Sequence, residues 1–192
     1  VLFAIAGESP VSVDVEVRGE IAGEDCSVLA TSALRGILSA SGVNDVTYVN
    51  APSLSQERGL VASVTTTGDS PDHRNMVFLS GALSNGERVS VSGTLMGIKR
   101  VEKIVEIDGL DVDVAFSDHL LFLRYTDRPG VVGAVGNALG ALGINIAGMQ
   151  VARNQRGGEA LMVLTVDSAI PADVLAKVAK ETSATARFVT LV

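Results

Sequence analysis

The sequence contains no tryptophan and only one cysteine, Cys26, and aromatic residues make up 4% of its 192 positions. A single cysteine excludes an internal disulfide and a multi-cysteine metal site, and it suits a reducing compartment, so we expect a cytoplasmic protein. We interpret Cys26 as a small buried apolar residue. With so few aromatic side chains, the core has to be built from Val, Leu, Ile and Ala.

Long apolar runs are also missing. No run approaches the roughly 20 residues that a membrane-spanning helix needs, although 47% of the residues are hydrophobic and the mean hydropathy is +0.37. We therefore expect no membrane partner. The first six residues, VLFAIA, have no basic flank and make a poor signal peptide. Because the sequence also begins without Met, we expect it to be part of a longer polypeptide.

Basic residues are scarce relative to acidic ones. The net charge is −7, from 15 Lys and Arg against 22 Asp and Glu, so we expect no nucleic-acid partner. Residues 1–117 hold 8 basic and 16 acidic residues, a net charge of −8, whereas residues 118–192 hold 7 and 6, a net charge of +1. This difference indicates two domains, 1–117 and 118–192.

Residues 1–117 have the pattern of an α+β domain with an antiparallel sheet. Val11 to Val17 alternate apolar and polar residues, which predicts a half-buried strand. A helix is predicted from Glu24 to Gly42, with Val28, Leu29, Leu34, Ile37 and Leu38 along its buried side. Further strands are predicted at 46–50, 60–66, 76–83, 89–95, 101–107 and 110–116, and a short helical turn from Pro52 to about Gly59. Asn85-Gly86 and Asp108-Gly109 predict tight hairpins, because these residues tolerate positive φ.

Residues 118–192 have a different pattern. Strands are predicted at 119–126, 144–152, 159–166 and 185–192, and helices at 131–142 and 171–181. This β-α-β-β-α-β order is typical of a ferredoxin-like domain. In the first of these helices, glycines 133, 136, 140 and 143 form a face against which a strand or a partner can lie closely, whereas Val131, Val135, Leu139 and Leu142 form the core face.

Catalytic and metal-binding constellations are missing from the sequence. His73 and His119 fall in different predicted domains without ligand partners at suitable spacing, and we interpret both as structural. The glycines at 130, 133 and 136 have the wrong spacing for a dinucleotide-binding loop, and no lysine follows for a phosphate loop. We therefore predict no catalytic residue and no metal site.

The segment Arg124–Val132 ends a strand and begins a helix at once. Backbone N–H groups at Gly130, Val131 and Val132 would face a small carboxylate at the positive end of that helix. Asp127 can accept hydrogen bonds from an ammonium group, so the segment matches an α-amino acid zwitterion. The alternative is that Asp127 only caps the helix.

Two sets of motifs carry a resemblance to known proteins. Asp127-Arg128-Pro129-Gly130, the glycine-rich helix and LGINI at 142–146 resemble an ACT domain, the small ligand-binding module of amino-acid metabolism. VSGTLMG at 91–97, KIVEIDG at 103–109, and RGIL at 35–38 followed by YVNAP at 48–52 resemble the intervening, allosteric substrate-binding domain of long-form bacterial D-3-phosphoglycerate dehydrogenases. In that family this domain precedes a C-terminal ACT domain, which is the order here.

The resemblance implies an NAD-dependent oxidoreductase of L-serine biosynthesis whose NAD-binding and substrate-binding domains lie upstream. This part alone is then inactive and holds no cofactor. The resemblance further implies feedback inhibition by L-serine, held between ACT domains of neighbouring subunits in a homo-oligomer, which we expect to be a tetramer in the parent enzyme. By position, Tyr125 (a His in other members) and Asp127 come from one chain and Asn145 from its partner. The alternative for Asn145 is a β-turn residue.

Some related intervening domains are thought to bind an anion. Lys99, Arg100 and Lys103 are the candidate anion-binding residues here, and His73-Arg74 could join them. The segment after Asp108-Gly109 is acidic where relatives are basic, so a solvated edge is the stronger expectation. Two other functions stay open: the effector domains of a bacterial L-serine dehydratase, and a free-standing amino-acid sensor.

Overall fold

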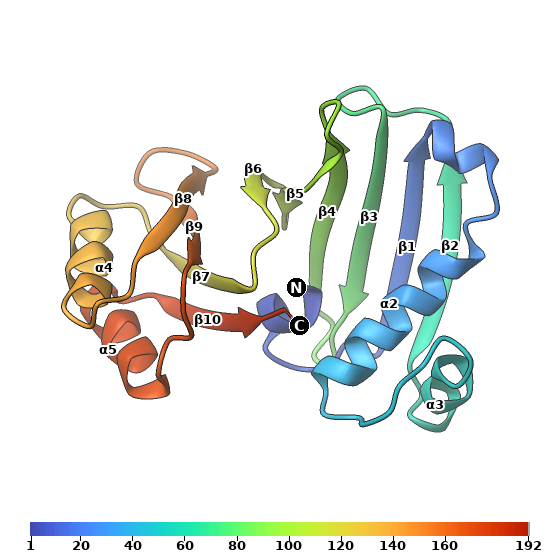
Figure 1. Cartoon of the computed structure of the whole chain (residues 1–192), viewed down its shortest axis with the longest axis horizontal. Helices are drawn as coiled ribbons and strands as arrows, with labels where there is room; N and C mark the ends of the chain where they lie inside the picture. The colour runs from blue at the N-terminus through green and yellow to red at the C-terminus, as the bar shows by residue number, and fades with distance from the viewer. Residues whose placement is uncertain (192) are drawn as a thin grey trace. The chain divides into compact units, whose positions relative to one another are not determined.

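The computed structural model describes residues 1–191, which form two sheets and their covering helices (Figure 1). One sheet has six strands in the order β2-β1-β3-β4-β5-β6, and the other has four in the order β10-β7-β9-β8. Contacts divide the chain into two compact units, Val1–Gly109 and a second that begins at Leu110. The α+β class with two domains is confirmed, and the domain limit at 117/118 stays a prediction. No helix among residues 1–191 is long and apolar enough to cross a membrane.

The first unit has a mixed sheet. Its elements are α1 (Leu2–Ala6), β1 (Ser12–Gly19), the 3-10 turn η1 (Glu20–Gly23), α2 (Ser27–Ala40), α3 (Ala51–Glu57), β2 (Val61–Thr67), β3 (Asn75–Ala82), β4 (Arg88–Met96) and β5 (Val101–Ile107). β1 is antiparallel to β3 but parallel to β2. The expectation of a wholly antiparallel sheet is therefore wrong. The parallel pair arises because the chain crosses over through α2 and α3 between β1 and β2, and so re-enters the sheet in the same direction.

The alternation in β1 buries Val13, Val15 and Val17, as predicted, and α2 packs against β1 and β2. Leu34, Ile37 and Leu38 are the buried residues of α2. Val28, which was expected on the same side, is 54% exposed. At about 100° per residue, Val28 lies more than a right angle away from the face that those three residues share.

The strand predicted at Val46–Asn50 is wrong, because this segment is a turn that leads into α3. The N–H of Thr47 donates to Asn50 Oδ1 (2.7 Å), and the N–H of Asn50 donates to Thr47 Oγ1 (3.2 Å). Val49 is 90% exposed, so its side chain is not part of the apolar core. Reciprocal side-chain bonds to the backbone favour a turn over a strand.

Both predicted hairpin turns are present, with different conformations. β3 and β4 are antiparallel, and between them only Gly86 has positive φ, at 87°. Asn85 instead accepts the N–H of Glu87 with its side-chain oxygen (2.9 Å). Asp108 and Gly109 both have positive φ, at 47° and 76°, as a type I′ turn requires.

From β7 onward, the second unit has the predicted ferredoxin-like order. Its elements are β6 (Leu110–Ala115), β7 (His119–Thr126), α4 (Val131–Gly140), β8 (Ile146–Arg153), β9 (Glu159–Val166), α5 (Ala172–Thr182) and β10 (Thr185–Thr190). The pairs β10–β7, β7–β9 and β9–β8 are all antiparallel. The predicted last strand ran to Val192, which lies outside the described residues.

One apolar core lies between a face of this sheet and the helices α4 and α5, which lie side by side (Figure 1). Val131, Val135 and Leu139 are buried in it as predicted. Leu142 is 53% exposed, because α4 ends at Gly140 and the chain has left the helix. Apart from the adjacent residues and the helix's own backbone, no described atom lies within 4 Å of where a Cβ would be at glycines 133, 136, 140 or 143. The glycine face therefore packs against no strand within residues 1–191.

Gly19, the last residue of β1, has a backbone conformation and a close contact that require glycine. It has φ 92° and ψ −154°, a region that only glycine populates, and a Cβ there would be 2.1 Å from the backbone oxygen of Arg74. We expect Gly19→Ala to lower the free energy of unfolding by about 2 to 4 kcal/mol. The control, Gly36→Ala in the open face of α2, should raise it by about 0.5 to 1 kcal/mol. Urea unfolding measures both, and equal stabilities would contradict the prediction.

Candidate functional site

Asp127 directly follows β7 and is fastened to the turn between β8 and β9. Its backbone N–H donates to the oxygen of Gly158 (2.8 Å). Its carboxylate oxygen Oδ2 accepts from Arg153 Nη1 (2.6 Å) and from the N–H of Gly157 (3.2 Å). No group among residues 1–191 donates a hydrogen bond to the second oxygen, Oδ1. The carboxylate is thus oriented at one oxygen and open at the other.

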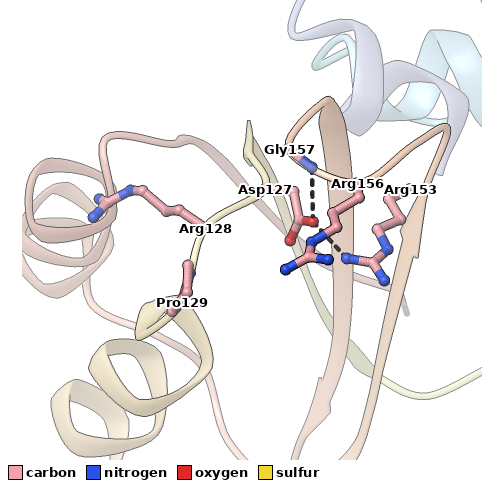
Figure 2. Close-up of a pocket in the computed structure, with 6 residues that line it drawn as sticks. All are labelled: Asp127, Arg128, Pro129, Arg153, Arg156 and Gly157. Carbon is pink, nitrogen blue, oxygen red and sulfur yellow. Dashed lines mark hydrogen bonds and ion pairs between the residues drawn. The ribbon is translucent and has the colours of Figure 1, made fainter.

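A pocket of about 360 Å³ opens at this carboxylate. It is lined by Asp127, Arg128, Pro129, Arg153, Arg156 and Gly157. Figure 2 shows Arg153, Arg156 and Gly157 grouped around Asp127, whereas Arg128 points away from it. Arg128 donates instead to the oxygen of Thr182 (2.9 Å), at the end of α5, where a cation is favourable.

The charges of the pocket keep Asp127 ionised. The Arg153 hydrogen bond, followed by that of Gly157, lowers the pKa of the Asp127 carboxyl, and the charges of Arg153 and Arg156 add to the effect. Tyr125, two residues before Asp127, is buried. Burial raises the pKa of its hydroxyl, and the charge of Asp127 raises it further. At neutral pH the pocket therefore presents one carboxylate among guanidinium groups.

The start of α4 lies next to the pocket but does not line it. Gly130 is the N-cap residue with φ 93°, and no side chain caps the helix. The alternative that Asp127 is the helix cap is therefore wrong. Val131 is buried and Val132 is half exposed. The first N–H groups of a helix have no helical carbonyl to bond, so those of Gly130, Val131 and Val132 can serve as donors.

Asn145 lies at the opposite end of the sheet from Asp127. It immediately precedes β8, and its Nδ2 donates to Asp167 Oδ2 (2.7 Å). Arg153, which contacts Asp127, is the last residue of β8. The length of β8 therefore separates Asn145 from Arg153 by a distance on the order of 25 Å. Asp127 and Asn145 of one chain do not share a small ligand. A site that contains both needs a second chain.

The candidate anion-binding residues lie in the first unit. Lys99 and Arg100 occupy the turn between β4 and β5, and Lys103 lies in β5 opposite Thr94. Arg74 pairs with Glu20 (2.7 Å) rather than joining them. Their role in anion binding stays a prediction.

Sequence reasoning missed Arg153, Arg156 and Gly157. Their place in the pocket depends on the β8–β9 turn, which the antiparallel pairing of β7 with β9 carries to the end of β7. A signal was available in the sequence, because RNQRGG at 153–158 is a basic, glycine-containing turn between two apolar strands.

Fold and pocket together define a protein with two α+β domains, the second of them ferredoxin-like. Family models match both parts: the D-3-phosphoglycerate dehydrogenase intervening domain matches residues 3–108, and the ACT domain matches residues 119–182. The chain belongs to the D-3-phosphoglycerate dehydrogenase intervening-domain family, with an ACT domain following it. The resemblance found in the sequence is confirmed.

Relatives agree with this assignment. The chain is 41% identical over 181 residues to a D-3-phosphoglycerate dehydrogenase of Mycobacterium leprae (strain TN), covering 94% of this chain and 34% of that protein. For the enzyme of the same name from Mycobacterium tuberculosis (strain ATCC 25618 / H37Rv), identity is 41% over 175 residues, with 91% and 33% covered. For that of Methanocaldococcus jannaschii it is 32% over 166 residues, with 86% and 31% covered. The chain spans about a third of the length of these relatives.

The Arg153–Asp127 pair can be tested by titration. We expect Arg153→Gln to raise the pKa of Asp127 towards the ordinary range, because the largest cause of its lowering is lost. A lowered folded-state pKa stabilises the fold above the unfolded pKa, and this contribution is lost as the pH falls through the folded pKa. The variant should therefore lose a small amount of stability above the unfolded-state pKa of about 4, and little below it.

Carboxyl-carbon NMR titration of Asp127 measures this pKa directly. Arg128→Gln is the matched control, because it removes the same charge from a side chain that bonds Thr182 instead of Asp127. An Asp127 pKa that responds equally to both substitutions would contradict the assignment.

Proposed function

We propose that the chain is the regulatory part of a D-3-phosphoglycerate dehydrogenase of L-serine biosynthesis, and that its ACT domain binds L-serine between two copies. The observation that carries the proposal is the ionised carboxylate of Asp127, which is held at Oδ2 and open at Oδ1 in a pocket at the end of β7. Such an acceptor suits the ammonium group of an amino acid.

The rest of the site fits a small polar ligand. The N–H groups of Gly130, Val131 and Val132 follow Pro129, which lines the pocket, and supply further donors. The Asn145 amide of a second chain offers both a donor and an acceptor to a hydroxyl group or a carboxylate. Tyr125, two residues before Asp127, belongs to the apolar core.

Exposed apolar surface on α4 and β8 supports association. Val132 in α4 is 50% exposed and Val151 in β8 is 39% exposed, and β8 is an edge strand of its sheet. The glycine face of α4 is open as well. A second copy that packs on these residues would bury apolar area. In the parent enzyme we expect a homotetramer.

The relatives favour a dehydrogenase over the dehydratase and free-sensor alternatives, since those reported above share one name. In the parent, NAD and the phosphoglycerate substrate would bind in further domains, and serine bound to the ACT pair would inhibit the enzyme in the cytoplasm as an end product.

Calorimetry with L-serine tests the ligand site. Asp127→Asn removes a charge-assisted contact worth about 1.5 to 3 kcal/mol, which is about one to two decades in affinity. Asn145→Ala should also weaken binding. The control is Asp173→Asn at the first turn of α5, which removes the same charge and should leave affinity unchanged. Equal affinities in all four proteins would place the ligand elsewhere.

Mixing the two binding variants tests whether the site is shared. When Asp127→Asn and Asn145→Ala chains are mixed and allowed to re-associate, each mixed pair regains one site with both native residues. About a quarter of all sites should then bind with native affinity, as two-fold symmetry requires. If mixing restores no sites, Asp127 and Asn145 do not act across an interface.

Association itself is predicted at micromolar concentration. We expect light scattering to give at least a dimer, and Val151→Lys, which puts a charge on the exposed edge of β8, to give a monomer with weak serine binding. The control is Val49→Lys, at a 90% exposed turn position in the first unit. A native monomer with and without serine, or an undisturbed oligomer in Val151→Lys, would contradict the proposed interface.

A further inference from the structure

Arg156 is the pocket residue to which the fold gives no partner. It lies in the turn between β8 and β9 and lines the pocket. Within residues 1–191 its guanidinium makes no hydrogen bond and no ion pair. Figure 2 shows it next to the Asp127 carboxylate, and its charge contributes to the lowered pKa of that group.

The other two arginines of the pocket are already engaged. Arg153 donates to Asp127 Oδ2 (2.6 Å), and Arg128 donates to the oxygen of Thr182 (2.9 Å). Asp127 balances the charge of Arg153, so the charge of Arg156 is left over in the pocket. A zwitterion whose ammonium takes Asp127 Oδ1 brings a carboxylate into the same space, and a guanidinium matches that carboxylate with two parallel N–H donors.

We propose that Arg156 holds the carboxylate of the bound amino acid while Asp127 holds its ammonium group. The assignment rests on the proposed function. It replaces the carboxylate subsite expected from the sequence at Gly130, Val131 and Val132, none of which lines the pocket. The N–H groups of those residues then remain for the ligand's other polar atoms. Arg156 thereby selects ligands with a free carboxylate next to the ammonium group.

A cycle of two ligands and two proteins tests this assignment. The native chain is titrated calorimetrically with L-serine and with L-serinamide, which keeps the ammonium and the hydroxyl but lacks the carboxylate. A charge-assisted pair predicts that the native chain binds L-serine roughly 10-fold or more tightly than the amide. In Arg156→Gln this preference should disappear, because the affinity for L-serine falls to that for the amide while the affinity for the amide changes little.

Arg187→Gln is the matched control, since it removes the same charge from an exposed residue of β10 that does not line the pocket. It should keep the preference for L-serine. If Arg156→Gln keeps the preference, or weakens both ligands equally, Arg156 does not hold the carboxylate, although the serine site itself stands. If the native chain binds neither ligand, the proposed function fails and this assignment fails with it. Folding does not confound the result, because Arg156 lies in an exposed turn.

Discussion

The register between β7 and β9 is the constraint on which the pocket depends. Their antiparallel ladder runs from Leu120 opposite Thr165 to Thr126 opposite Glu159, and it continues into the bond from the Asp127 N–H to the Gly158 oxygen. A slip of one residue would turn every side chain of β7 to the other face of the sheet. Leu121, Leu123 and Met162 of this pair are fully buried in the core beneath the helices, so the apolar core contributes to placing the partly exposed carboxylate.

The pocket combines order with accessibility. Asp127 and Arg153 form an ion pair with 18% and 51% of their side chains exposed, and pairs at such exposure add little to the stability of a fold. The pair is therefore better explained as a device for orientation, because it fixes one carboxylate oxygen and leaves the other to solvent. Bonding of the same oxygen to the Gly157 N–H makes the orientation a property of the turn as well as of Arg153.

Sequence patterns predicted elements well where periodicity is local. The strand 119–126 was predicted with the bounds of β7, and every other element of the ACT domain within two residues of its described ends. Val46–Asn50 failed because reciprocal Thr47–Asn50 bonds outweigh apolar composition. The parallel β1–β2 pair and the place of Arg153 and Arg156 were missed for one reason: they depend on which distant strands pair, and a single sequence shows periodicity but not pairing.

Antiparallel geometry also explains how residues at opposite ends of one sheet can serve one ligand. β8 is an edge strand with Asn145 before its first residue and Arg153 at its last. A two-fold axis that sets two β8 edges antiparallel brings the beginning of one strand beside the end of the other. In the proposed dimer, the Asn145 of each chain would approach the Asp127 pocket of its partner, and each interface would have two equivalent sites. A ligand bound there contacts both chains, so its binding free energy adds to the free energy of association. Under the proposed function, sensing an amino acid and tightening the oligomer are then the same event.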